Sequence, residues 1–178
     1  MPTQPEPRWL TRQERGAWMR LQAVLQLLPA ALDAQLRHDS DFTHVEYYSM
    51  AMLSDAPNHQ LQTKELAAHT NSSLPRLSRV ISGLEAEGLV LRIPNERDAR
   101  ATDVQLTERG QKALIDAAPG HVNKVRNTIF DPLTPADVEA VVRVCDAWLD
   151  VLDPEQRLSR DPDHLPGHPA CCPHNLQL

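Results

Sequence analysis

The chain has 178 residues, of which 41% are hydrophobic and 24% charged, and its formal net charge is −6 at pH 7, as in a single globular domain. No apolar run approaches the roughly 18 residues that span a membrane, and residues 1–7 lack the basic start and apolar stretch of a secretion signal, so we expect a cytoplasmic protein without a membrane partner. The net negative charge argues against nucleic acid as a partner unless cations gather locally on one face.

Prolines are concentrated at both ends of the chain. Three of the 15 lie in the first eight residues and five in the last 26. Such segments favour arms and tails over packed structure. We therefore assign residues 1–10 to an N-terminal arm and residues 154–178 to a disordered tail rich in Pro, His and Cys.

The first folded segment contains two predicted helices. A capping box at Thr11 to Glu14 is followed by apolar residues at steps of three and four as far as Leu36, which predicts one long helix, bent at Pro29. A second helix is expected over residues 43–54, because the turn signal Asp-Ala-Pro-Asn follows it.

The next segment predicts a helix, a tight turn, a second helix and a hairpin. Residues 63–69 form the first helix and residues 70–73 a polar turn. The second helix has an apolar stripe at Leu74, Leu77, Ile81 and Leu84, and Gly88 is expected to end it in the left-handed conformation. Strands are expected at residues 89–93 and 102–106, with a charged loop at residues 94–101 between them.

Two further helices carry apolar stripes at steps of three and four. The first stripe is Ile115, Ala118, Val122, Val125 and Ile129. The second follows a helix start at residues 134–137 and is Val138, Val141, Cys145, Trp148 and Leu152. The middle of the chain, about 50 residues, is too small to cover these stripes and that of the first helix. A partner surface is therefore expected, most simply a second copy of the chain in a homodimer.

These elements carry an ordered series of sequence signals. They are Leu66-Ala67 in the short helix, LSRVISGLEAEGLV at residues 77–90, Asp98-Ala99-Arg100, and Leu106-Thr107-Glu108-Arg109-Gly110. In this order, from roughly Thr11 to Leu152, the chain resembles the MarR family of winged helix-turn-helix transcriptional regulators. The resemblance implies a mainly α fold with a small β-hairpin wing, and terminal helices that form an obligate homodimer. It also implies that the second helix of the motif enters the DNA major groove and the wing the minor groove.

The resemblance divides the folded part into three segments. Residues 11–42 would be a dimerisation helix, residues 43–107 the winged helix-turn-helix lobe that binds DNA, and residues 108–153 further dimerisation helices. The protein would then be a sequence-specific, double-stranded DNA-binding repressor with a near-palindromic operator. A small-molecule effector in a crevice between the dimer and DNA lobes would release it, and we expect it to be associated with the nucleoid.

Helical geometry selects the residues that would face DNA. With the apolar stripe inward, the opposite side presents Ser72, Ser73, Pro75, Arg76, Arg79 and Ser82. Arginine suits a guanine edge or a phosphate, and short hydroxyls suit phosphate oxygens. The alternative is a solvated helix face, which an isolated pattern of this kind would favour. Within the predicted motif, we expect Arg76 or Arg79 to contact DNA.

The tip of the hairpin carries Arg97 and Arg100 on either side of Asp98. An arginine in a narrow minor groove gains from its negative potential, and a nearby carboxylate can hold the guanidinium and the loop in shape. By the resemblance, Arg100 is the wing arginine and Asp98 the wing aspartate, which positions the loop without touching DNA. The alternative is a mobile charged hairpin. Residues 71–100 hold five arginines against four acidic residues, so we expect modest affinity with a salt penalty.

No sequence signal predicts an enzyme or a cofactor. The chain lacks a Gly-rich phosphate loop, a Gly-x-Ser-x-Gly elbow and a His-Glu-x-x-His motif. Metal-ligand residue types come close together only in the tail, at His164, His168, Cys171, Cys172 and His174. We predict no metal site there, because adjacent cysteines chelate one tetrahedral ion poorly. The alternative function is a metal- or thiol-redox-responsive sensor that acts through this tail, and a chain ending at Asp153 would then lose its response.

An effector crevice is expected along the first two helices. Aromatic residues with polar tips, which suit a small planar aromatic ligand, are Trp18, His38, His44, Tyr47 and Tyr48. The alternative is an aromatic core with histidines on the surface. His44 together with His121 falls short of a full set of zinc ligands.

Overall fold

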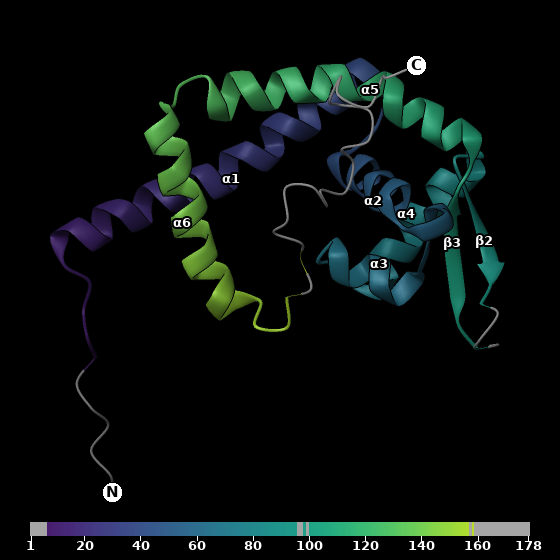
Figure 1. Cartoon of the computed structure of the whole chain (residues 1–178), viewed down its shortest axis with the longest axis horizontal. Helices are drawn as coiled ribbons and strands as arrows, with labels where there is room; N and C mark the ends of the chain where they lie inside the picture. Colours follow the sequence, from purple (N-terminus) through teal and green to yellow (C-terminus); the bar gives the residue numbers. More distant parts are fainter. Residues whose placement is uncertain (1–6, 96–97, 99, 157, 159–178) are drawn as a thin grey trace, which may run out of the picture.

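The computed structural model describes residues 7–95, 98, 100–156 and 158 of the chain. Its helices are α1 (Arg12–Ser40), α2 (His44–Asp55), α3 (Thr63–His69), α4 (Leu74–Ala86), α5 (Glu108–Val125) and α6 (Pro135–Leu152), with a 3-10 turn η1 (Pro57–His59) and a π turn η2 (Arg126–Phe130). Its strands are β1 (Gln60–Gln62), β2 (Val90–Pro94) and β3 (Thr102–Leu106). The prediction of a mainly α fold with a small β wing is confirmed (Figure 1).

The three strands form one antiparallel sheet in the order β1-β3-β2. β2 and β3 make the predicted hairpin, with Val90 opposite Leu106 and Pro94 opposite Thr102. β1 is not predicted from the sequence, because three residues are too few to show the alternation of a strand. It pairs with the other edge of β3, where Gln62 lies opposite Asp103, and so joins the segment before α3 to the wing.

α2, α3, α4 and the sheet enclose one apolar core, to which the C-terminal part of α1 and the first half of α5 also contribute side chains. Its largest fully buried side chains are Leu36, Met50, Leu53, Leu66, Leu77, Ile81, Leu84, Val90 and Val104. α2 contributes most to this core, because seven of its twelve residues are buried. Gly88 ends α4 with a φ of 71°, as expected for a left-handed cap. The shared core holds α3, α4 and the wing as one lobe, so their exposed residues have fixed relative positions.

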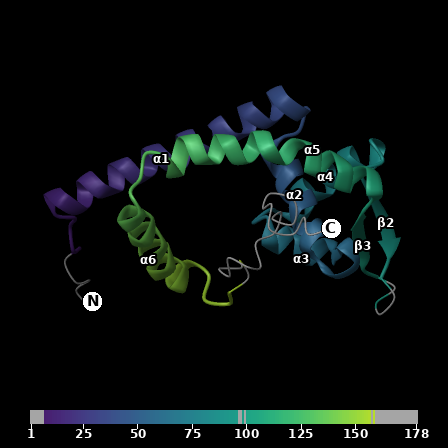
Figure 2. The ribbon, with the colours of Figure 1, turned by 45° about the horizontal axis from the view of Figure 1, so that its top comes forward.

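α1 and α5 run side by side at the edge of this lobe (Figures 1 and 2). α1 continues through Pro29 and buries only Leu32 and Leu36, both in its C-terminal third. With 29 residues it is about 44 Å long, and its N-terminal half extends beyond the lobe (Figure 2). No helix in the described part of the chain is long and apolar enough to cross a bilayer.

α6 turns sharply away from α5 (Figures 1 and 2). None of its 18 residues, all of which the structure describes, is buried. α5 buries Leu114, Ala117 and Ala118 but leaves Ile115, the first residue of its predicted stripe, 43% exposed. The large apolar side chains exposed on α1 and α6 are Trp18, Met19, Val24, Leu25, Leu27, Val141, Val142, Val144, Trp148, Val151 and Leu152. A single chain therefore leaves an extended apolar surface over its terminal helices.

Candidate nucleic-acid interface

α4 presents two arginines on the side opposite the core. Leu77, Ile81 and Leu84 are buried, which places Arg76 and Arg79 in the solvent. Pro75 lies in the first turn of the helix and is also exposed. Leu74, expected in the core, is 50% exposed, because it is the first residue of α4 and lies beyond the edge of the core. The N-terminal half of α4 thus projects cationic side chains away from the lobe.

The turn before α4 is held by backbone and hydroxyl hydrogen bonds. Asn71 takes the left-handed conformation with a φ of 45°, and the Ser72 N–H donates to the Ala67 carbonyl at 2.9 Å. The Ser72 hydroxyl donates to the Thr70 carbonyl at 3.2 Å. Ser73 is exposed and its side chain does not cap α4 in the described structure. Ser73 therefore keeps its hydroxyl available to an outside group.

Arg92 on β2 joins the wing to the outer side of α4. Its guanidinium forms an ion pair with Glu85 and donates to the Ser78 carbonyl at 3.0 Å and to Ser82 Oγ at 2.9 Å. The Ser82 hydroxyl in turn donates to the Ser78 carbonyl at 2.9 Å. Ser82, predicted to contact DNA, therefore already lies within a hydrogen-bonded cluster of the chain.

The described part of the wing tip is organised by Asp98. Its Oδ1 accepts the backbone N–H of Arg100 at 2.9 Å, and its carbonyl accepts the Ala101 N–H at 2.9 Å. The predicted positioning role of Asp98 thus corresponds to contacts with the loop backbone. Arg100 and Asp98 are both exposed, whereas Arg97 lies outside the described residues.

A groove of about 320 Å³ separates the wing from the helix-turn-helix. Its lining comes from α3, α4, the strands and the residues beside them: Gln62, Thr63, Lys64, Leu74, Ser78, Arg92, Arg100, Ala101 and Thr102. Three of these residues, Lys64, Arg92 and Arg100, are cationic. Lys64 is absent from the sequence prediction, because only the fold brings the start of α3 beside the hairpin. Lys64 and Arg100 offer an anion positive charge from two sides of the groove, because the Arg92 guanidinium is already paired with Glu85.

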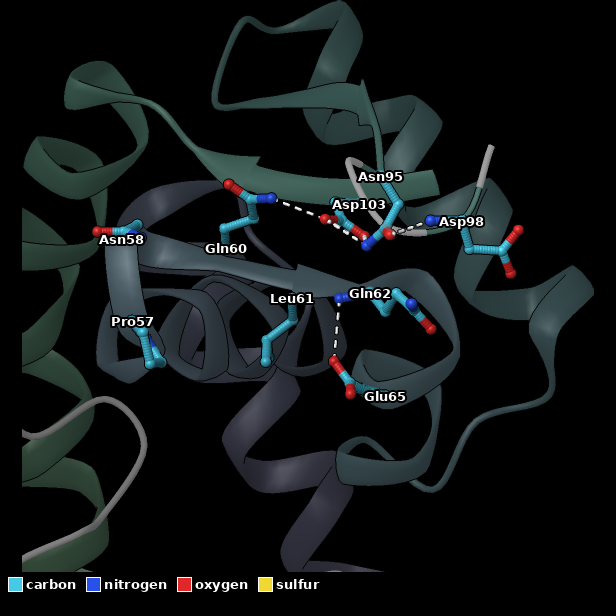
Figure 3. Close-up of a pocket in the computed structure, with 9 residues that line it drawn as sticks. All are labelled: Pro57, Asn58, Gln60, Leu61, Gln62, Glu65, Asn95, Asp98 and Asp103. Carbon is cyan, nitrogen blue, oxygen red and sulfur yellow. Dashed lines mark hydrogen bonds between the residues drawn. The ribbon is translucent and has the colours of Figure 1, made fainter. Parts of the chain in front are cut away.

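A second, more polar pocket of about 410 Å³ lies on the β1 side of the wing (Figure 3). It is lined by Pro57, Asn58, Gln60, Leu61, Gln62, Glu65, Asn95, Asp98 and Asp103. The side chains of Gln60 and Asn95 point toward the carboxylate of Asp103 (Figure 3). Lys and Arg are absent from this lining, so the cationic groove is the better surface for a nucleic acid.

The predicted effector residues separate into two groups. His44, Tyr47 and Tyr48 lie together on α2, with the His44 ring centroid 6.2 Å from that of Tyr48. His121 of α5 joins them, 4.6 Å from Tyr47 and 6.0 Å from His44 between ring centroids. Trp18 and His38 are twenty residues apart on α1, about 30 Å along the helix, so one crevice in a single chain does not include both.

Burial lowers the pKa of both histidines in this cluster. For His44, desolvation is opposed in part by the nearby Asp33 carboxylate, which accepts the His44 backbone N–H at 2.9 Å. For His121, the proximity of His44 adds to the effect of desolvation. Both imidazoles are therefore neutral at pH 7, and the cluster is an aromatic, uncharged surface between α2 and α5.

The proposed metal-ligand types of the tail, His164, His168, Cys171, Cys172 and His174, lie outside the described residues. Within the described part of the chain, no group of three or more His, Cys, Asp or Glu side chains is arranged to hold a metal ion. The one cysteine that the structure describes, Cys145, is exposed on α6.

Comparison with known proteins gives a consistent set of relatives. Residues 42–102 match the model of the MarR family. Sco3205, a MarR family transcriptional regulator from Streptomyces coelicolor solved in complex with DNA, is 34% identical with a TM-score of 0.80, and the match covers 86% of this chain and 96% of that one. AbsC, a MarR family regulator of the same organism, is 32% identical with a TM-score of 0.77, and 82% and 98% of the two chains are covered.

Two curated relatives match over shorter stretches. The HTH-type transcriptional repressor YetL of Bacillus subtilis is 32% identical over 76 residues, which is 43% of this chain and 46% of YetL. The transcriptional repressor MprA of Escherichia coli is 25% identical over 107 residues, 60% of each chain. The chain thus spans about half the length of the curated relatives it matches.

Proposed function

Because this chain belongs to the MarR family of transcriptional regulators, we propose that it is a homodimeric repressor of transcription. It binds a near-palindromic operator in double-stranded DNA and is released by a small planar aromatic effector. Sco3205, which shares 34% of its residues with this chain, was solved in complex with DNA, and YetL and MprA are named as repressors.

The observation that carries this proposal is the cationic side of an otherwise acidic chain. Arg76 and Arg79 project from α4, while Lys64, Arg92 and Arg100 border the groove between α4 and the wing. Phosphate contacts require cations within a few ångströms rather than a positive total charge. A duplex lying across this side would meet helix arginines in its major groove and the wing in its minor groove.

Each predicted contact residue has its own proposed role in this arrangement. Arg76 and Arg79 contact base edges or phosphates, and Ser73 and Lys64 contact phosphates. Ser72, Pro75 and Ser82 shape the surface, since the hydroxyls of Ser72 and Ser82 are already bonded within the chain. Arg100 enters the minor groove, Arg97 of the same loop adds positive charge there, and Asp98 fixes the loop backbone.

Dimerisation is proposed to use residues 11–42 and 108–153, with residues 43–107 as the DNA-binding lobe. α6 buries no residue within its own chain although much of it is apolar. Exposure of so many large apolar side chains on a soluble regulator indicates a partner surface. A second copy supplies the matching surface because a two-fold dimer pairs each patch with itself.

The proposed effector site is the aromatic cluster of His44, Tyr47, Tyr48 and His121. It lies where α2 of the DNA-binding lobe meets α5, and α5 continues to the terminal helices. Planar rings with polar tips suit a flat aromatic ligand. Trp18 and His38 on α1 enter the proposal only as groups that a second protomer could bring close to such a cluster.

The proposal is tested by selecting DNA with the full chain. Duplexes of about 30 bp, long enough for two half-sites and their flanks, are selected from a randomised library, and footprinting then locates the contacts. We expect a near-palindromic consensus whose affinity falls steeply with salt. Failure to enrich any sequence, with the folded protein verified by circular dichroism, would refute the proposed function.

A further inference from the structure

A series of polar contacts runs from β1 through Asp103 and Asn95 to Asp98 of the wing loop (Figure 3). Its centre is Asp103 on β3, which is only 5% exposed. The Asp103 carboxylate accepts a hydrogen bond from Gln60 Nε2 at 2.7 Å. It also accepts from Asn95 Nδ2, which lies 2.9 and 3.0 Å from its two oxygens. Two side-chain amides, one from β1 and one from the end of β2, thus converge on one buried carboxylate.

The contacts continue from Asn95 into the loop. Asn95 Oδ1 accepts the Asp98 N–H at 2.9 Å, and Asp98 Oδ1 accepts the Arg100 N–H at 2.9 Å. The Asn95 N–H donates to the Ala101 carbonyl at 3.2 Å, which closes the neck of the loop. The backbone of Arg100 is therefore connected to a buried residue of β3 through successive hydrogen bonds.

The wing needs such a connection because the paired strands end where the loop begins, so strand pairing does not hold the loop itself. The last pair is Pro94 with Thr102, and Asn95, Asp98, Arg100 and Ala101 follow or precede it outside the strands. A free loop would lose conformational entropy on binding DNA, whereas a loop held in its bound shape loses less. A buried acceptor satisfied by two amides also gives the loop one defined geometry.

We propose that Asp103, Asn95 and Gln60 are positioning residues that anchor the wing before DNA binding and so present Arg100 to the minor groove. None of the three touches DNA in this proposal, which rests on the proposed function of Arg100. The carboxylate at position 103 is the centre of the anchor, because it alone accepts from both neighbouring amides.

An exchange of the two partner residues tests this geometry. In Asp103→Asn, an amide replaces the carboxylate, so one of the donors, Asn95 or Gln60, faces another N–H group. In the double variant Asn95→Asp with Asp103→Asn, the new carboxylate at position 95 accepts from the new amide at position 103 and from the Asp98 N–H. The oxygen of that amide still accepts from Gln60. Each hydrogen bond of the anchor again has one donor and one acceptor.

Affinity is measured by fluorescence anisotropy on a labelled duplex that the wild-type protein has selected. Each variant is measured alone and in combination with Arg100→Ala. We expect Asp103→Asn to weaken binding by about five- to twentyfold, as for a lost buried hydrogen bond. The exchanged double variant should recover wild-type affinity to within about twofold. In a protein that already carries Arg100→Ala, Asp103→Asn should cause no further loss of affinity. Glu155→Gln, the same charge change at an exposed position after α6, outside the proposed dimerisation and DNA-binding segments, should leave affinity unchanged.

Two further measurements keep the proposal falsifiable. Asn95→Ala removes the same connection without changing the buried residue, and it replaces Asp103→Asn if that variant fails to fold. Hydrogen exchange of the Arg100 amide in the free protein should speed up in both single variants and return to the wild-type rate in the exchanged one. This readout needs no DNA.

The outcomes separate the anchor from the function. If Asp103→Asn weakens binding equally with and without Arg100, or if the exchanged variant fails to recover, the anchor is refuted and the proposed function stands. If the wild-type protein selects no duplex, the proposed function fails, and the hydrogen exchange of Arg100 still decides whether the anchor holds the loop.

Discussion

At the scale of single residues, the arginines of α4 and of the wing should differ in what they contribute to binding. Arg76 and Arg79 are exposed on the helix proposed to enter the major groove, whereas Arg100 lies on the hairpin. If either helix arginine contacts a guanine with two hydrogen bonds, its change to Ala should cost about 1–3 kcal/mol per half-site. Base preference should then weaken at one symmetric pair of operator positions.

Arg100→Ala should instead weaken binding to many sequences together and reduce the salt dependence, apart from some lost preference for A·T-rich flanks. The measurement is affinity for a panel of operator variants at several salt concentrations. Lys112→Ala, on the exposed surface of α5, removes the same charge and serves as the control. Unchanged base preference in both Arg76→Ala and Arg79→Ala would show that neither residue reads sequence.

The two half-buried histidines of the aromatic cluster, His44 and His121, make stability depend on pH. Burial lowers the pKa of His44 and His121 from the 6.5 of an exposed histidine, so over the interval between the two values the unfolded chain binds more protons than the folded chain. Their contribution to stability is therefore full above pH 6.5 and is lost as the pH falls through the folded pKa. Asp33, which faces His44 from α1, reduces the shift but does not reverse it.

Urea unfolding at about pH 7.5 and at about pH 5.5 compares the stability above and below the ordinary histidine pKa. The loss of stability at the lower pH should be smaller in His121→Gln than in the wild-type protein, because the variant has one fewer histidine to protonate. His38→Gln, on the exposed part of α1, should keep the wild-type difference. An identical difference in His121→Gln and the wild-type protein would contradict the effect of burial.

Some residues of the proposed DNA-binding site can be predicted from the sequence and others cannot, for a geometrical reason. Arg76 and Arg79 follow from helical periodicity, because a local apolar stripe defines the opposite face. The link between Gln60 and Asp103 spans 43 positions, and the start of α3 comes beside the wing only in the fold. Pairing of distant polar residues leaves no periodic signal, which is why Lys64, Arg92 and Asp103 are absent from the predicted site.

At the scale of elements, the joint between the wing and α5 depends on Gly110. A Cβ at this position would overlap the Leu89 carbonyl oxygen and lie 2.7 Å from Leu106 Cδ1. The Leu89 carbonyl also accepts the Thr107 N–H at 3.0 Å, so the Leu89 backbone cannot move away without breaking this hydrogen bond. We expect Gly110→Ala to lower the free energy of unfolding by about 2–4 kcal/mol.

Thermal or urea unfolding measures this effect, and Gly83→Ala provides a matched control within α4. A Cβ at Gly83 would meet only Glu46 Oε1, at 3.8 Å, in a helix interior where Ala is preferred over Gly. That variant should be stabilised by about 0.5–1 kcal/mol. Equal free energies of unfolding for Gly110→Ala and Gly83→Ala would mean that a Cβ at position 110 does not clash with the Leu89 backbone.

Capping signals locate helices well, but they do not decide which face of a helix is covered. The capping box predicted at Thr11 and the helix start predicted at residues 134–137 both correspond to capped helix starts, and the structure also has a capping box at Thr43. On α5, however, the structure buries Leu114 and Ala117 against its own chain and leaves Ile115 outside. An α-helix with apolar residues on two sides contacts two surfaces, and its sequence does not say which one belongs to the same chain.

For the whole molecule, net charge and binding function are reconciled by the separation in space between the DNA-binding lobe and α6. The proposed DNA-facing side carries the arginines of α4 and of the wing, whereas α6, from Pro135 to Leu152, contains a single arginine against four acidic residues. The acidic helix lies away from the lobe (Figure 1), so its repulsion of DNA is reduced by distance and by salt. The net charge of the full chain therefore does not reveal the positive electrostatic potential of the proposed DNA-facing side.

Dimerisation should be the condition for operator binding. The apolar surface of α1, α5 and α6 predicts an obligate interface of more than roughly 2,000 Å², and sedimentation of the wild-type chain should give a dimer at every workable concentration. Trp148→Glu places a charge on the exposed apolar side of α6 and should give monomer or aggregate. Glu139→Gln, on the same helix and also exposed, should remain dimeric.

The operator itself should report the same symmetry. Two α4 helices related by a two-fold axis should protect half-sites about one helical turn apart, near 10 bp from centre to centre. Because each protomer contributes half of the contacts, Trp148→Glu should bind a full operator no better than an isolated half-site, whereas Glu139→Gln should keep the full affinity. Footprinting and anisotropy on both duplexes measure this. A folded monomeric Trp148→Glu that retained wild-type affinity would mean that one lobe suffices, and the exposed face of α6 would then need another partner.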